Sequence, residues 1–152
     1  MKSANDSSFG SLLDRVKMES YMTISKEVKN LDMPWEKEYG YSQAVKVGDT
    51  IYLSGQIRHE ETGEIVGVGD VEAQIRQAYV NINKLLAEYG SSLENIVDET
   101  WFVTDIEAGN ALAGKLRKEI YSGSQAVALT VVQIGRLAFP ELLIEIKCVA
   151  KV

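Results

Sequence analysis

Hydrophobic residues recur at helical spacing in two segments of the chain. Between Asp70 and Gly90 the apolar positions lie three or four residues apart, which predicts a helix capped by Asp70 and ended by Gly90. A second helical stripe runs through residues 104–120. Thr104 and Glu107 have the spacing of a capping box, so we expect Thr104 to be the N-cap of this second helix.

Most of the remaining chain alternates between apolar and polar positions, as strands do. The alternation predicts strands over 42–47, 50–57, 95–104, 126–137 and 144–152, with weaker signals over 20–30 and 64–68. Gly48-Asp49 is a hairpin turn signal, whereas the Pro34-containing segment 31–40 predicts a loop. This order of elements indicates an α+β sandwich, in which one mixed β-sheet carries two helices on one face.

The second face of this sheet is predicted to be uncovered in a single chain. We expect it to carry apolar residues, among them Trp101, Leu129 and Val131. Exposed apolar patches are typical of association surfaces. The pattern alone therefore predicts an oligomer.

Composition narrows the classes of function. The chain has 152 residues and a net charge of −6, which argues against nucleic acid as a partner because phosphate binding needs clustered basic residues. No stretch approaches the roughly 20 apolar residues of a membrane helix, and the polar start lacks a signal peptide. Cys148 is the single cysteine, expected to be a buried thiol, and it favours a reducing compartment. We expect a cytoplasmic protein that does not enter the membrane.

Few residues suit catalysis. His59 is the one histidine and is expected in an exposed turn, which argues against a metal site or a Ser-His-Asp triad. Glu145, between two isoleucines, could orient a water or accept a proton; alternatively it is a solvated residue paired with Lys147 or Arg136. Gly55 interrupts a strong strand pattern, which indicates either close approach to a ligand or a simple sheet irregularity.

Several motifs together resemble the Rid (YjgF-type) family. They are GDTIYLSGQI (48–57), the turn TGEIV (62–66), the helix AQIRQAYVNINKLLAEYG (73–90) and the closing IEIKCVA (144–150). The resemblance covers 39–152, so we expect a Rid-like domain there and an N-terminal extension over 1–38.

The resemblance implies a chorismate-mutase-like fold and a homotrimer whose sheets form a central barrel with ligand clefts between subunits. It also implies hydrolytic deamination of reactive enamines and imines, with neither cofactor nor metal. By the same resemblance Glu145 positions the attacking water, while Tyr41, Ser54 and Gly55 hold a small-molecule substrate. Leu129 stands where the family has an arginine that binds the substrate carboxylate.

The leucine at position 129 leads to two hypotheses about the function. Leucine offers no donor, so an amino-acid-derived imine loses a charge-assisted contact worth about 1.5–3 kcal/mol. One hypothesis is a Rid-like hydrolase with altered specificity, and the other is a non-catalytic ligand-binding trimer. The endoribonuclease activity often attached to the family fits poorly with an acidic chain that has one histidine.

Overall fold

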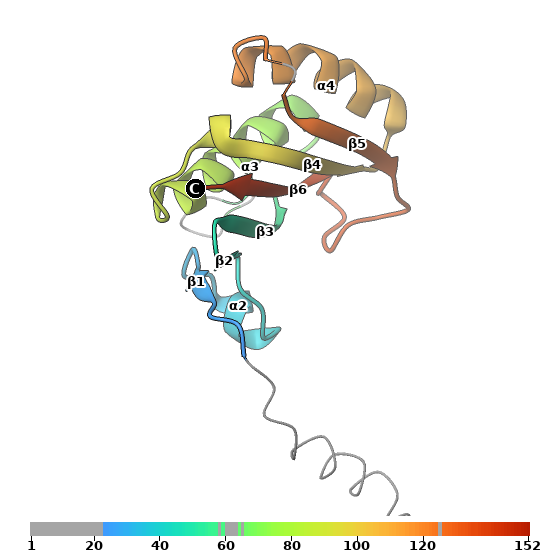
Figure 1. The fold of residues 1–152 in the computed structure, drawn as a ribbon. Coiled ribbons are helices and arrows are strands. Elements are labelled where there is room, and N and C mark those ends of the chain that lie inside the picture. Colours follow the sequence, from blue (N-terminus) through green and yellow to red (C-terminus); the bar gives the residue numbers. More distant parts are fainter. Residues whose placement is uncertain (1–22, 58, 60–63, 65, 125) are drawn as a thin grey trace, which may run out of the picture.

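The computed structural model describes residues 23–57, 59, 64, 66–124 and 126–152 (Figure 1). Its elements are β1 (Glu27–Lys29), α2 (Pro34–Glu38), β2 (Ala44–Val47), β3 (Thr50–Gln56), α3 (Val71–Ala87), the short 3₁₀ helix η1 (Leu93–Asn95), β4 (Ile96–Val103), α4 (Ile106–Ile120), β5 (Ala128–Gln133) and β6 (Ile144–Lys151).

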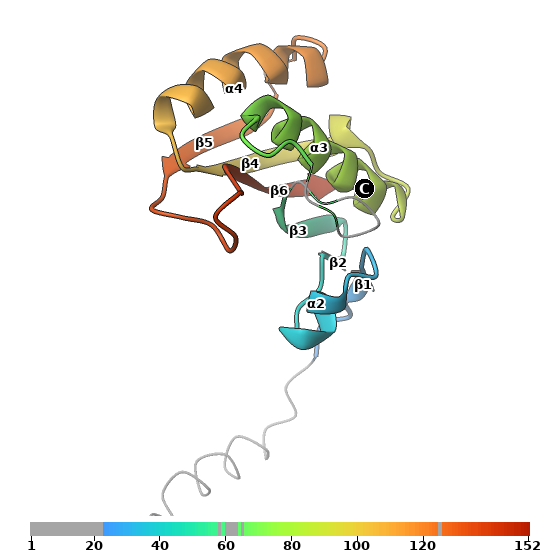
Figure 2. The same ribbon diagram turned by 180° about the vertical axis from the view of Figure 1, so that it is seen from behind.

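The strands form one six-stranded sheet in the order β1-β2-β3-β6-β4-β5. Neighbouring strands are antiparallel except β4 and β5, which are parallel and joined through α4. Both long helices, α3 and α4, lie on the same face of the sheet (Figure 2). The expected mixed sheet with two helices on one face is thus confirmed, and none of the helices that the structure describes covers the opposite face (Figure 1).

Local signals explain the hairpin and the start of α3. The two-residue turn between β2 and β3 places Gly48 at φ +58°, a left-handed conformation that glycine adopts without strain. At α3 the Asp70 side chain accepts a hydrogen bond from the Ala73 amide at 3.0 Å, as expected of an N-cap.

The capping prediction for α4 was wrong by one residue. Asp105 is the N-cap, and its side chain accepts from the amides of Glu107 at 2.9 Å and Ala108 at 3.1 Å. Thr104 cannot take that role because its amide and hydroxyl both donate to the Leu143 carbonyl, at 3.1 and 3.4 Å. Thr104, the residue after β4, is therefore hydrogen-bonded to the segment that precedes β6.

Four segments differ from the sequence pattern. The segment expected to be a loop contains α2, which Pro34 can begin because its missing N–H would have no helical partner at that position. Residues 64 and 66–68 are not in a strand. Strand β5 is half the length expected, and of the weak 20–30 signal only β1 is a strand in the part that the structure describes.

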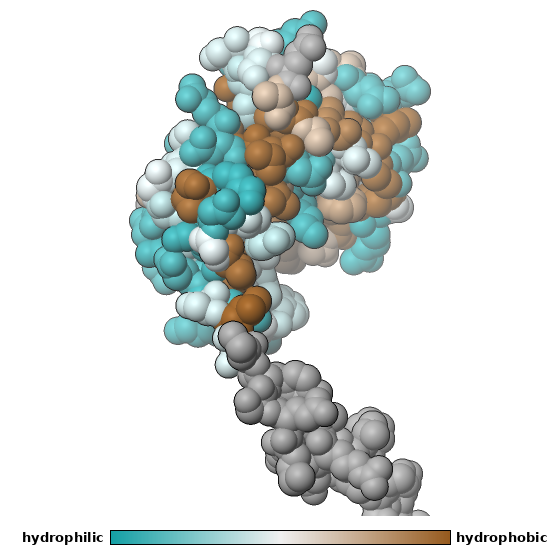
Figure 3. All heavy atoms as spheres, in the orientation of Figure 1, coloured by the Kyte–Doolittle hydropathy of each residue, from teal (hydrophilic) through white to brown (hydrophobic). Residues whose placement is uncertain are grey.

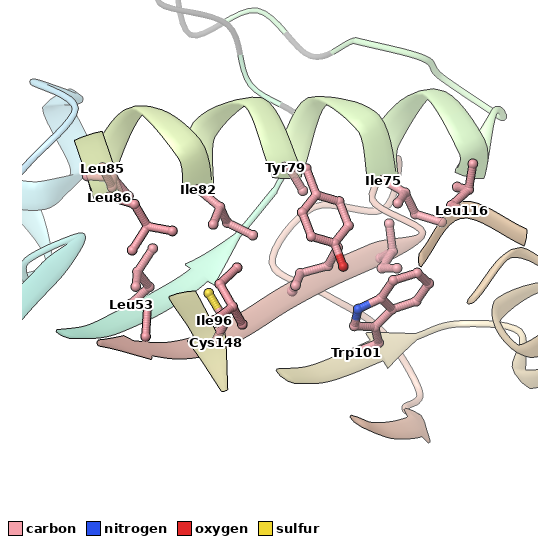
Figure 4. Close-up of a cluster of buried hydrophobic side chains, with 14 of the residues drawn as sticks. Leu53, Ile75, Tyr79, Ile82, Leu85, Leu86, Ile96, Trp101, Leu116 and Cys148 are labelled. Carbon is pink, nitrogen blue, oxygen red and sulfur yellow. The ribbon is translucent and has the colours of Figure 1, made fainter. Parts of the chain in front are cut away.

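The hydrophobic core lies between the helices and the sheet (Figure 4). Its fully buried side chains include Ile75, Ile82, Leu85 and Leu86 from α3, Leu116 from α4, and Leu53, Ile96, Trp101 and Cys148 from the strands. Each large apolar side chain buried in this way contributes roughly 1.5–3 kcal/mol. The buried Cys148 confirms the expected structural thiol, and burial raises its pKa.

The residues expected on the uncovered face lie on the helix side instead. Trp101 is fully buried, and Leu129 and Val131 pack against the same core. In the parallel register Leu129 is opposite Glu99 and Val131 is opposite Trp101, so all four share one face. The three apolar residues thus share a face, as expected, but it is the face that the helices cover, and Glu99 is buried there with polar partners.

Glu99 joins both helices to the sheet as a buried carboxylate. Tyr79 donates to its Oε1 at 2.6 Å, Tyr121 donates to the same oxygen, and the Arg117 guanidinium donates to Oε2 at 2.9 Å. Arg117 also donates to the Val127 carbonyl at 3.0 Å. Burial and the negative charge of Glu99 raise the pKa of Tyr79 and of Tyr121, so both phenols remain donors.

The uncovered face carries other apolar residues. Tyr52 is 51% exposed and pairs with Val149 of β6, and Val132 is 38% exposed and pairs with Phe102 of β4. Hydrophobic side chains gather over this part of the sheet in Figure 3. The same face also carries Lys147 and Lys151 of β6 and Thr130 of β5, so the expectation of an apolar face holds only in part and with different residues. Among the described residues, no helix has the length and hydrophobicity needed to cross a bilayer.

Candidate functional site

A cavity of about 420 Å³ opens where β3 departs from regular pairing with β6. Tyr41, Ser54, Gly55 and Glu145 all line it, so the structure brings together four of the five site residues expected from the sequence. The exception is Leu129, which packs against the core on the helix-bearing face and is not part of the cavity wall of a single chain.

The irregularity in β3 is a bulge. Leu53 pairs with Cys148 and Gln56 pairs with Ile146, so Ser54 and Gly55 together face one residue of β6. The Ser54 hydroxyl donates to the Ser42 carbonyl at 2.7 Å, and its amide donates to the Gln43 carbonyl at 2.8 Å. These bonds fix the bulge against the segment that carries Tyr41.

Gly55 makes room for the carboxylate of Glu145. A Cβ atom at position 55 would lie 1.9 Å from Glu145 Oε1 and 2.3 Å from its Cδ, far inside contact distance. The glycine is therefore required by a close approach, and the group that approaches is the candidate catalytic side chain. The bulge is the sheet irregularity that the sequence offered as one interpretation, while close approach to a ligand stays a prediction. Position 145 lies at the start of β6, on the uncovered face.

Glu145 is half-buried, and burial raises its pKa above the ordinary range of a glutamate. A carboxyl group in this state exchanges a proton closer to neutral pH than a solvated one does. This is a property that general acid–base catalysis uses.

A chain of polar side chains supports Tyr41 on the other wall. Gln56 donates to Gln43 Oε1 at 2.8 Å, and Gln43 donates to the Tyr41 hydroxyl at 3.4 Å. Burial, followed by the negative charge of Glu36, raises the pKa of Tyr41. The phenol therefore remains protonated at neutral pH and can donate a hydrogen bond to a ligand.

The prediction that His59 is an exposed turn residue was wrong. It is 4% exposed, lines the cavity, and meets the Trp35 ring edge-to-face with centroids 5.3 Å apart. The cause is a long-range clamp: the Asn81 amide donates to the carbonyls of Ile57 and His59, each at 3.0 Å. A side chain of α3 thus draws the chain after β3 against the body of the protein.

The aromatic walls of the cavity were not among the site residues assigned from the sequence. Trp35 from α2, Tyr39 directly after it, and Phe139 from the segment before β6 all line the site. Trp35 and Tyr39 lie in or beside the stretch expected to be an extension. The one signal was an unusual concentration of aromatic residues in PWEKEYGY (34–41).

Gln74 holds the segment that carries Phe139. Its side-chain nitrogen donates to the carbonyls of Gly67 and Glu141, both at 3.1 Å, and its side-chain oxygen accepts from the Leu143 amide at 2.8 Å. Gln74 and Asn81 belong to the helix motif that carried the family resemblance. Their role in this structure is to anchor loops around the site. In the described part of the chain, no three acidic, histidine or cysteine side chains are grouped to hold a metal ion.

The fold and this site define a small α+β protein with a carboxylate at a sheet bulge, and the chain is similar in sequence and fold to known proteins. Residues 32–152 match the sequence profile of the family described as Endoribonuclease L-PSP. A RutC family protein of Pyrococcus abyssi is 39% identical over 114 residues, which cover 72% of this chain and 84% of that protein. The mitochondrial protein mmf1 of Schizosaccharomyces pombe is 33% identical over 110 residues, covering 72% of this chain and 67% of its own.

The structural likeness agrees. A crystal structure of a member of the YjgF/YER057c/UK114 family from Mycobacterium tuberculosis superimposes with a TM-score of 0.73 and 27% identity, covering 84% of this chain and 100% of the other. The chain belongs to the Endoribonuclease L-PSP family, which confirms the resemblance to the Rid (YjgF-type) family.

Proposed function

We propose that this protein is a cofactor-independent hydrolase of imines or enamines, with Glu145 as its catalytic residue. The observation that carries the proposal is the position of the Glu145 carboxylate. It lies directly over Gly55, half-buried in a cavity with several aromatic walls, and burial raises its pKa.

The chemistry needs one proton acceptor beside a bound water. Glu145 takes a proton from the water as its oxygen bonds to the carbon of the protonated imine, giving a neutral carbinolamine. Glu145 then returns that proton to nitrogen, and the C–N bond breaks as the hydroxyl group loses its own proton to the departing ammonia, so that ammonium ion and a carbonyl product are released. Tyr41 and the backbone at Gly55 hold the substrate, and general base catalysis of this kind supplies about 10²–10⁴-fold in rate.

The specificity is proposed to differ from that implied by the family. Leu129 packs toward the helices, and no lysine or arginine is among the described residues that line the cavity. The same observation favours the second candidate, a protein that binds a small ligand without converting it. An endoribonuclease reaction gains no support, because the lining residues offer no basic surface for a phosphate backbone.

The hydrolase is tested with imines made in place. An amino-acid dehydratase supplies 2-aminoacrylate and an amine oxidase supplies an imine without a carboxylate, and carbonyl release is followed with and without the protein. We expect the protein to accelerate release from at least one imine over buffer. Buffer rates with both would rule out this hydrolase and leave ligand binding as the function.

We propose that three copies assemble through their uncovered sheet faces into a barrel. The face around Tyr52 and Val132 exposes apolar side chains, and no described element of the chain covers it. Light scattering at micromolar concentration is expected to give three times the chain mass. A Val132→Asp variant places a charge in the proposed interface and is expected to lower the mass, while a monomeric mass for the unchanged protein would contradict the assembly.

The cytoplasm remains the proposed location, supported by the reduced, buried Cys148. The fission yeast relative is described by its name as mitochondrial. Cell fractionation with an antibody against the full chain distinguishes the two compartments.

A further inference from the structure

The cavity combines aromatic faces with negative charge. Trp35, Tyr39, Tyr41 and Phe139 contribute rings, and Glu145 contributes a carboxylate. None of the described lining residues is a lysine or an arginine, which is the reverse of what an anionic ligand requires.

A second carboxylate, that of Glu36, influences Tyr41 on the cavity wall. Glu36 is 6% exposed and accepts a hydrogen bond from the Leu31 amide at 3.0 Å, so its side chain is fixed. After burial, the charges of Glu36 and then Glu145 raise the pKa of Tyr41, which shows that both fields reach the Tyr41 ring. Two carboxylates therefore lie close enough to Tyr41 to disfavour a negative charge there.

Two of the four rings are held in place by their neighbours, and the other two are exposed. Trp35 is held edge-to-face against the buried His59, and His59 is held by Asn81. Tyr41 is held by Gln43. Tyr39 is 74% exposed and Phe139 is 49% exposed, which leaves their faces open to a ligand at the mouth. Aromatic faces attract cations, and indole attracts them most strongly.

We propose that the cavity binds organic cations, and that its substrate is the protonated imine of a simple amine that carries no carboxylate. The positive nitrogen lies between the Glu145 carboxylate and the Trp35 and Tyr41 rings. The claim that this cation is a substrate rests on the proposed hydrolase function. The preference for a cation is a property of the cavity and is measurable without turnover.

The charge of the ligand suits the reaction. A protonated imine is a cation and also the form that water attacks most readily, so binding and activation favour the same species. Hydrolysis converts R–CH=NH₂⁺ and water into R–CHO and NH₄⁺, which balances atoms and charge. A substrate carboxylate would face Glu145 with no cation from the described walls to offset the repulsion. The reaction that supplies this substrate is oxidation of a primary amine, with an oxidase or dehydrogenase removing the two electrons.

Three ligands with one ring and different charges test the proposal on the full chain. Benzylammonium, benzyl alcohol and benzoate are titrated calorimetrically at pH 7, and all are small enough for a cavity of 420 Å³. We expect benzylammonium to bind about tenfold more tightly than benzyl alcohol, the range of a partly desolvated cation–π contact. Benzoate is expected to bind more weakly than the alcohol.

Matched variants assign the preference to the cavity. Glu145→Gln is expected to reduce the ratio of benzylammonium to benzyl alcohol affinity severalfold, and Trp35→Leu is expected to reduce it as well. Glu72→Gln removes the same charge from a surface ion pair with Arg76 and Lys115, outside the cavity, and is expected to leave the ratio unchanged. The ratio is internal to each variant, so a general loss of folded protein does not mimic the effect.

Turnover separates this inference from the proposed function. Benzoate binding as tightly as benzylammonium, or a ratio that Glu145→Gln leaves intact, would overturn the cation site. Hydrolysis of 2-aminoacrylate but not of the benzylamine-derived imine would overturn the substrate class and retain the hydrolase. Cation-selective binding with no hydrolysis of either imine would retain the cation site and reject the hydrolase.

Discussion

Replacing Glu145 by glutamine is expected to lower imine hydrolysis by about 10²–10⁴-fold, the usual contribution of a positioned general base. The amide fills the space over Gly55 but cannot accept the proton of water. In the unchanged protein, activity should fall as the pH drops through the Glu145 pKa, which burial places above the ordinary glutamate range. Initial rates of carbonyl release between pH 4 and pH 8 check both expectations.

Two further variants show that the loss is local. Glu72→Gln makes the same substitution on the exposed face of α3 and is expected to keep the full rate. Gly55→Ala puts a methyl group where the Glu145 carboxylate lies, and we expect it to lower the rate without altering any ionisable group. A Glu145→Gln protein that hydrolyses imines at the original rate would remove Glu145 from the mechanism.

Stability should move in the opposite direction from activity. Because burial raises the folded-state pKa of Glu145, folding favours its protonated form, and the group costs stability as pH rises from the unfolded pKa to the folded pKa. The glutamine variant avoids that cost. Its melting temperature at pH 7 should therefore equal or exceed that of the unchanged protein, and the difference should disappear in acid.

Replacing Glu99 by alanine is expected to destabilise the protein by about 3–5 kcal/mol, the cost of breaking one side of a buried ion pair. The variant leaves the Arg117 guanidinium and the hydroxyls of Tyr79 and Tyr121 without their acceptor. Urea unfolding at one fixed protein concentration measures the change, since the stability of an oligomer depends on concentration.

The matched control is Glu72→Ala. Glu72 also bonds two cations, Arg76 at 2.8 Å and Lys115 at 2.9 Å, but at the surface, where such pairs are worth about 1 kcal/mol or less. Adding Arg117→Met to Glu99→Ala removes the unpaired charge and should restore part of the loss. Equal effects of the two alanine substitutions would show that burial of Glu99 contributes nothing.

The fold was predictable wherever local signals agreed with tertiary structure. Helical spacing and the Asp70 cap placed α3, and Gly48-Asp49 placed the hairpin. The orientation of β4 and β5 was not predictable in the same way. A charged residue normally marks the solvent side, but Glu99 is satisfied by Arg117 and two tyrosines from distant segments. Their meeting is a property of the packed structure and leaves no local trace.

The residues of the candidate site were likewise predictable only where they left a local signal in the sequence. Glu145 and Gly55 could be found because a carboxylate among isoleucines and a glycine within a strand each break a local pattern. Trp35 and Phe139 could not, because they enter the cavity from opposite ends of the chain. His59 was misplaced because the clamp from Asn81 acts across 22 residues. Leu129 was assigned by resemblance to a cleft between subunits; within one chain its register with Glu99 places it against the core, and its place in an assembly stays a prediction.

The contacts of Gln74 have a consequence for engineering. The Gln74 side-chain amide hydrogen-bonds to the backbone of Gly67, in the segment before α3. It also bonds to the backbone of Glu141 and Leu143, in the segment before β6. The residues around Phe139 lie just outside that anchor and pair with no strand. We therefore expect residues 138–140 to accept a different sequence. Such a change would reshape the opening of the cavity, while the hydrogen bonds of Gln74 keep the neighbouring backbone in place.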